Sequence, residues 1–219
     1  MTPTLIFLGL LMATVVWWLV RQSVNVKPWV ASAPSGAHQG VGQLATIKVG
    51  LGVFLAVATS LFALFVSAYA IRMELSDWRP LPEPNLLWVN TGILFVGSVG
   101  LQWAWRAASR EQLRGVKQGL VVGGVCAIAF VIGQLIAWRQ LNAAGYFITS
   151  NPANAFFYLL TSLHAVHLFG GLVAWFKTIT RAWAGSEISS VRLGVELCAV
   201  YWHFLLVVWL ILFGLLLST

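Results

Sequence analysis

The chain alternates between long apolar runs and short polar segments. Six runs have about the length that a helix needs to cross some 30 Å of hydrocarbon. They hold no charged residue except Glu196, near the start of the last run, and cover residues 4–20, 49–71, 86–105, 118–138, 155–176 and 193–217. Inside lipid a single chain segment satisfies its backbone hydrogen bonds only as a helix. The pattern therefore predicts an all-α bundle of six transmembrane helices, the first being the shortest.

Glycine and proline mark the boundaries between the runs. Residues 31–42 are rich in Gly, Ser, Ala and Pro, which is typical of a flexible connector. Three prolines in residues 79–84 exclude a helix there, because proline lacks a donor and restricts its neighbour. Asn151-Pro152 marks another boundary. We expect an N-terminal transmembrane helix within residues 1–30, a cytoplasmic connector at 31–47 and a helical core at 48–219.

The composition agrees with a membrane protein. Hydrophobic residues make up 59% of the 219 residues, charged residues 9%, and the mean hydropathy is +0.85. A water-soluble domain carries roughly 25% charged residues. The chain therefore lacks the polar surface of a soluble globule, and its length suits one compact helical bundle without an added soluble domain.

The net charge of +7 is distributed unevenly over the loops. The loops after the first, third and fifth runs carry ten basic residues, namely Arg21, Lys27, Lys48, Arg106, Arg110, Arg114, Lys117, Lys177, Arg181 and Arg192. The alternate loops carry only three, balanced by acids. By the positive-inside rule we expect both termini on the outer side of a cell inner (plasma) membrane. Anionic lipid, not nucleic acid, is the expected partner of this charge.

The N-terminal run was compared with a secretory signal peptide. No positive residue precedes it, whereas Arg21 and Lys27 follow it, the reverse of a signal peptide. We therefore expect it to be retained as a helix with its N-terminus outside.

Ionisable side chains inside apolar runs are costly in lipid and are the candidates for chemistry. His164 and His167, three residues apart, share one helix face, and His203 lies in the next run. Three imidazoles are possible ligands of a metal or haem iron, but no H-E-x-x-H or C-x-x-C-H motif accompanies them. The alternative, which we favour, is hydrogen bonding to neighbouring helices or lipid head groups. Cys126 and Cys198 are expected to be buried thiols.

Glu196 and His203 are two helical turns apart on one face. They could relay protons or form structural contacts with another helix, and we favour the structural role. Together with His164 and Trp202 they predict a polar seam on the last two helices. Gly170 and Gly171 next to the histidines would let another helix approach closely. Eight tryptophans lie near predicted span ends, as in an interfacial belt: Trp17, Trp18, Trp88, Trp103, Trp105, Trp138, Trp175 and Trp183.

Three segments carry a family resemblance. Residues 156–171 have the sequence FFYLLTSLHAVHLFGG, close to the pattern F-Y-x-L-T-G-x-H-x-x-H-V-x-x-G. Residues 196–209, from Glu196 through Tyr201-Trp202-His203-Phe204 to Trp209, follow E-x4-Y-W-H-F-V-D-V-V-W. A third match is Pro80-Leu81-Pro82 followed by residues 87–91, LWVNT. In this order the segments resemble subunit III of the haem-copper respiratory oxidases.

The resemblance implies a fold and a function. Residues 48–217 would form the five-helix core of the shorter family form, and the helix at 4–20 would be an addition. The chain would be a non-catalytic subunit of a terminal oxidase that reduces O2 to water and translocates protons, packed beside subunit I with subunit II in the complex. Haem and copper would belong to those partners, with none in this chain. Supported proton uptake and a phospholipid held by His167 and Arg181 are further implications.

Two positions depart from the family pattern. Thr59 stands where the family usually has a buried Glu, and Leu206 replaces the Asp of H-F-V-D-V-V-W. A proton-handling role that rests on those carboxylates does not carry over. Two alternatives stay open: a subunit-III-like partner of a quinol oxidase or nitric oxide reductase, and a free-standing membrane cytochrome with His164, His167 and His203 as ligands.

Overall fold

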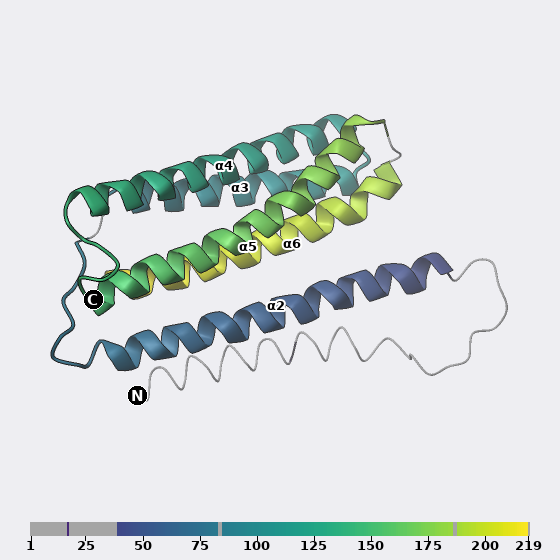
Figure 1. The fold of residues 1–219 in the computed structure, drawn as a ribbon. Helices are drawn as coiled ribbons and strands as arrows, with labels where there is room; N and C mark the ends of the chain where they lie inside the picture. Colours follow the sequence, from purple (N-terminus) through teal and green to yellow (C-terminus); the bar gives the residue numbers. More distant parts are fainter. Residues whose placement is uncertain (1–16, 18–38, 83–84, 186–187, 219) are drawn as a thin grey trace. The chain divides into compact units, whose positions relative to one another are not determined.

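The computed structural model describes residue 17 and residues 39–82, 85–185 and 188–218. The elements within them are five helices: α2 (Gln39–Arg72), α3 (Leu86–Ser109), α4 (Leu113–Ala143), α5 (Pro152–Trp183) and α6 (Ile188–Leu217) (Figure 1). Each contains a stretch long and apolar enough to cross a membrane. The all-α class and five of the six predicted helices are confirmed. The first predicted helix, at 4–20, lies outside the described residues apart from Trp17.

The helices extend beyond the apolar runs that predicted them. α4, for example, adds about five residues at each end of the run 118–138, because a helix continues past the hydrocarbon into the head-group region. α2 begins at Gln39, so residues 39–47, expected to belong to the connector, are helical. Its membrane-spanning part begins at Thr46. The loop at 79–82 is not helical, as its prolines predict.

The chain divides into two compact units, residues 1–67 and 68–219, which we describe separately. In the first unit the described part is α2 up to Ser67. Its hydroxyl groups bond to their own helix: Thr59 Oγ1 donates to the Leu55 carbonyl at 2.7 Å and Ser60 Oγ to the Ala56 carbonyl at 3.0 Å. Such back-bonding satisfies a hydroxyl without a second helix.

The second unit begins with the last turn of α2 and the loop after it. The four helices that follow form a ring. α3 packs on α4 and α6, α5 also packs on α4 and α6, and α4 and α6 make a smaller contact across the ring (Figure 1). The three-residue connection between α3 and α4 makes these two antiparallel neighbours. Glu111 in this turn has a φ of 57°.

Glycines on α4 bring it close to α3. A Cβ on Gly119 would lie 2.6 Å from the Gly100 carbonyl oxygen and 2.7 Å from the Ala104 nitrogen, so two backbones touch at this point. Four residues further on, a Cβ on Gly123 would lie 2.5 Å from Cγ of Leu101. In lipid, small residues at such spacing allow the close van der Waals contact that holds helices together.

Tryptophans join neighbouring helices through their indole N–H groups. Trp138 on α4 donates to Thr161 Oγ1 on α5 at 3.1 Å, and Trp175 on α5 donates to the Leu120 carbonyl on α4 at 2.8 Å. We expected both to belong to an interfacial belt, and this interpretation was incomplete. An apolar interior makes an unsatisfied N–H costly, so an indole that faces another helix takes an acceptor there.

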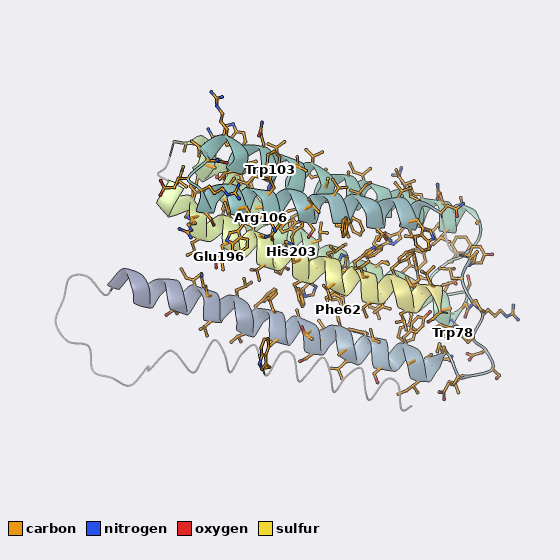
Figure 2. All side chains as sticks on the ribbon, turned by 180° about the vertical axis from the view of Figure 1, so that it is seen from behind. Phe62, Trp78, Trp103, Arg106, Glu196 and His203 are labelled. Atoms are coloured by element: carbon orange, nitrogen blue, oxygen red, sulfur yellow. The ribbon has the colours of Figure 1, made fainter. Side chains whose placement is uncertain are left out.

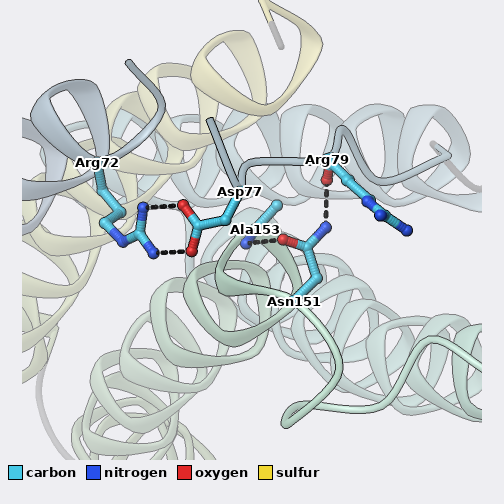
Figure 3. Close-up of polar contacts among 5 residues, drawn as sticks. All are labelled: Arg72, Asp77, Arg79, Asn151 and Ala153. Atoms are coloured by element: carbon cyan, nitrogen blue, oxygen red, sulfur yellow. Dashed lines mark hydrogen bonds and ion pairs between the residues drawn. The ribbon is translucent and has the colours of Figure 1, made fainter. Parts of the chain in front are cut away.

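A polar network fixes the loop that precedes α3 to the start of α5 (Figure 3). Arg72 makes two hydrogen bonds to Asp77, one of them at 2.7 Å. These bonds hold the pKa of the Asp77 carboxyl below its ordinary value, so the pair contributes at neutral pH and is lost as the pH falls through that lowered pKa. Asn151 caps α5 by accepting from the Ala153 N–H at 3.2 Å, and its Nδ2 donates to the Arg79 carbonyl.

Two Asn151 variants should distinguish the contribution of the helix cap from that of the hydrogen bond to the loop. Asn151→Ala removes both contacts and should lower the free energy of unfolding in detergent by about 0.5–2 kcal/mol, the usual value of an N-cap. Asn151→Asp retains the capping oxygen and loses only the donor to Arg79. Thermal unfolding should therefore show the larger loss for Ala, while limited proteolysis at residues 73–82 should accelerate in both. Equal unfolding midpoints for the two variants would contradict the capping role.

Candidate functional site

His164 lies at the centre of the four-helix ring. Its side chain is 0% exposed and packs against the rings of Phe130 on α4 and Trp209 on α6, with ring centroids 5.7 and 5.3 Å away. Trp209 in turn donates its indole N–H to Thr91 Oγ1 on α3 at 2.9 Å. This central cluster of His164, Phe130, Trp209 and Thr91 therefore draws one side chain from each of the four helices.

His167, one turn further along α5, contributes through its backbone. Its Nδ1 lies 2.8 Å from the Leu163 carbonyl and must donate, because a carbonyl oxygen only accepts. The carbonyl of His167 accepts the hydroxyl of Tyr201 on α6 at 2.8 Å. This bond joins α5 to α6 in the part of the chain where the sequence predicted a polar seam.

The two adjacent glycines of α5 differ in their surroundings. A Cβ on Gly171 would lie 2.7 Å from ring atoms of both Tyr201 and Trp202, whereas a Cβ on Gly170 would have nothing within 4 Å. Gly171 therefore gives room for the two aromatic rings of α6, and the predicted close approach belongs to Gly171 and not to Gly170. Trp202, predicted as part of the seam, is 2% exposed and packs at this contact.

The two remaining seam residues on α6 are half-buried and lie apart from one another. Glu196 and His203 are seven residues apart, which corresponds to about 10 Å along the helix axis. This distance is longer than a single hydrogen bond. His203 Nδ1 bonds to the Ala199 carbonyl on its own helix at 2.5 Å. The separation does not provide the direct carboxylate–imidazole contact that a short proton relay requires.

The predicted lipid residues both lie on α5 but at different depths. Arg181 is exposed in the last turn of the helix, and His167 lies near its middle. Fourteen residues correspond to about 21 Å of helix. A single phosphate group cannot contact both side chains at this separation.

The positions that depart from the family pattern carry no ionisable group. The hydroxyl of Thr59 donates a hydrogen bond to the Leu55 carbonyl of its own helix. Leu206 on α6 is 9% exposed. Neither cysteine is in a disulfide; Cys198 is buried, with its Sγ 3.6 Å from Thr178 Oγ1, and Cys126 is partly exposed. The burial predicted for Cys198 is confirmed and that for Cys126 only in part.

Two buried amides were not singled out from the sequence. Asn90 on α3 and Gln134 on α4 are 0% and 2% exposed, and their side-chain amides make no hydrogen bond with the residues that the structure describes. A Cβ on Gly133 would lie 2.1 Å from Asn90 Oδ1, so this glycine makes room for the amide. The sequence signal for both residues is a polar side chain within an apolar run.

The histidines do not gather into a metal centre. Within residues 39–82, 85–185 and 188–218, no group of three or more His, Cys, Asp or Glu side chains is placed to hold a metal ion. The three histidines of the described helices make contacts within the bundle: His164 with two aromatic rings, and His167 and His203 each with a carbonyl of its own helix. The ring contacts of His164 join α5 to α4 and α6.

Comparisons with known proteins agree with the motifs. The family model described as cytochrome c oxidase subunit III matches residues 3–217. The chain is 30% identical over 172 residues to a probable cytochrome c oxidase subunit 3 of Mycobacterium tuberculosis, an alignment that covers 76% of this chain and 85% of the relative. It is 29% identical over 186 residues to cytochrome c oxidase subunit 3 of Synechocystis, covering 82% and 78%.

The family match is longer than the resemblance predicted. The motifs placed the similarity in residues 48–217, and the helix at 4–20 was interpreted as an addition outside it. The match begins at residue 3 and so includes that segment. The motifs lie only in the later helices, which is why they could not show similarity in a segment without a motif.

A matched pair of glycine variants tests the α5–α6 contact. Gly171→Ala should lower the free energy of unfolding in detergent by about 1–3 kcal/mol, because the added methyl group displaces the rings of Tyr201 and Trp202. Gly170→Ala, one position away, should be neutral or stabilising by up to about 1 kcal/mol, since alanine favours a helix. Equal effects in a thermal or denaturant unfolding experiment would show that the close contact is not at Gly171.

Proposed function

The chain belongs to the cytochrome c oxidase subunit III family, and on this basis we propose that it is the accessory third subunit of a haem-copper terminal oxidase. In this proposal the complex reduces O2 to water and couples the reaction to proton translocation, while haem and copper reside in partner subunits. The family match over residues 3–217 carries the proposal. The five helices, each able to span a membrane, make the chain a multi-pass membrane protein, as such a subunit must be.

The proposed role is to stabilise the catalytic subunit by packing beside it, with subunit II in the same complex. Large apolar side chains on the outside of the four-helix ring support this role. Phe95, Val125, Ile132 and Phe169 are each about half exposed or more. In a membrane such a surface contacts either lipid or the apolar surface of another subunit.

The contacts of the histidines support an accessory role over a free-standing cytochrome. A haem iron with two histidine ligands needs their ring nitrogens on opposite faces of a macrocycle. His164 is enclosed by Phe130 and Trp209, and His203 lies on a different helix with Nδ1 on the Ala199 carbonyl. Room for a macrocycle between them would require the central cluster to open.

A role in proton uptake would depend on two carboxylates that this chain lacks. Thr59 and Leu206 replace the two carboxylates on which it would rest, and neither side chain ionises near neutral pH. We therefore propose that this subunit contributes to turnover by holding its neighbours and lipid in place, without carrying protons at these two positions.

We also propose that α5 holds a phospholipid in the cytoplasmic leaflet of the plasma membrane. In this proposal, which the positive-inside rule supports, the end of α5 is on the cytoplasmic side and both termini of the chain are outside. Arg181 is exposed there, and Lys117 Nζ lies 5.3 Å from the centroid of the Trp183 ring, so two cations meet the head-group region. Because about 21 Å of helix separates Arg181 from His167, we propose that Arg181 contacts the phosphate and His167 contacts an acyl chain of the same lipid.

Purification tests the main proposal. The full chain, tagged at one terminus and extracted from its native membrane in mild detergent, should bring with it a haem-bearing partner and an oxidase activity. The chain expressed alone should be colourless. A Soret band in the isolated chain that disappears in His164→Ala or His203→Ala would overturn the accessory role. The substrate that the purified complex oxidises, cytochrome c or quinol, distinguishes the two kinds of oxidase, and nitric oxide reduction would identify the other alternative.

Native mass spectrometry of the purified complex tests the lipid. The double variant His167→Ala, Arg181→Ala should retain less phospholipid than the wild type, and most of the loss should be present in Arg181→Ala alone because a charge-assisted bond to the phosphate is removed. His167→Ala alone should have the smaller effect. Unchanged retention in the double variant would refute the site.

A further inference from the structure

A groove on the outside of the four-helix ring lies between α3 and α6 and is separate from the proposed lipid site on α5. Its volume is about 530 Å³, and it is open along one side. The lining changes in character along its length. Phe95, Val99 and Leu206 make one part mainly apolar, with Ser98 and His203 beside them, while Gln102, Trp103 and Arg106 line the other part.

The polar part offers groups that suit one anion. Arg106 is exposed, and among the described residues it makes neither a hydrogen bond nor an ion pair. Trp103, also in the lining, is half exposed. Figure 2 shows Trp103, Arg106 and His203 along adjacent stretches of α3 and α6. A planar guanidinium is well matched to two phosphate oxygens.

The length and depth of the groove match a lipid. From Phe95 to Arg106 is eleven residues, about 16 Å along α3, and one leaflet occupies about half of the 30 Å hydrocarbon core. Arg106 is three residues from the last residue of α3, where the helix leaves the membrane. The apolar part therefore lies at the depth of acyl chains and the guanidinium at the depth of head groups.

The charges around the groove favour an anion on balance. Arg110 and Arg114 follow Arg106 closely along the chain. Glu196 is the acid whose negative charge opposes these arginines. The bond between Thr91 and Trp209 sets the register of α3 against α6 and places Glu196 at a depth similar to that of Arg106, although Glu196 is not part of the lining.

We propose that this groove binds one phospholipid, with its phosphate on Arg106 and its acyl chain along Phe95, Val99 and Leu206. The site uses residues of α3 and α6, none of which belongs to the site on α5. It does not depend on the oxidase role, since it follows from the groove and its charge alone.

The experiment uses the intact complex in nanodiscs of phosphatidylcholine with a minor fraction of phosphatidylglycerol as the probe. Native mass spectrometry then counts the phosphatidylglycerol retained. Arg106→Gln keeps the length of the side chain and removes its charge, and should lower retention at one site roughly tenfold. Arg110→Gln is the matched control, four residues away in the same basic end and outside the groove. Val99→Trp should also lower retention, because an indole ring fills the apolar part.

Three results would overturn the proposal. Equal retention in Arg106→Gln and the wild type would exclude the phosphate contact. An equal loss in Arg106→Gln and Arg110→Gln would show a general effect of surface charge. Loss of the partner subunit from Arg106→Gln or Val99→Trp, with lipid unchanged, would identify the groove as a protein interface. Thermal unfolding of each variant in detergent, with midpoints close to the wild type, confirms that the comparison is between folded proteins.

Discussion

The structure depends on the direct contact between the backbones of α3 and α4. Burial of apolar surface does little to drive the association of two helices in lipid, because the surrounding acyl chains are as apolar as the side chains. Gly119 and Gly123 remove this difficulty by letting the α3 backbone approach to a distance at which even one added Cβ would collide. The short turn at residues 110–112 keeps the two helices antiparallel. The remaining helices of the ring pack against this pair.

Aromatic side chains then join the pair to α5 and α6. Trp138, Trp175 and Tyr201 each donate a hydrogen bond to a neighbouring helix, and Trp209 does so from the central cluster to Thr91. Each donor carries a large apolar ring as well as its N–H or O–H, so one residue supplies both packing area and a satisfied polar contact. This explains why a bundle with so few charged residues still has defined register between its helices.

The apolar pattern was sufficient to predict the helices but not how they contact one another. Five runs became helices because lipid leaves no other way to satisfy the backbone. The partners of Trp138 and Trp175 depended on which helix faces which, and the run pattern holds no such information. The sequence did contain Gly115, Gly119 and Gly123 at four-residue intervals, a usable signal for a close contact. Asn90 and Gln134 were equally visible as amides within apolar runs.

In the candidate site too, the sequence identified the residues but not their contacts. The seam residues were found from their chemistry, but their roles depended on neighbours: His164 became part of an aromatic core, and His167 contributed its carbonyl. These side chains make contacts inside the bundle, where the amides of Asn90 and Gln134 are also buried. Arg106 and Arg181 are exposed instead, near the ends of their helices on the strongly basic side. In the proposed role the protein acts through its outer surface, by holding other subunits and lipid beside it.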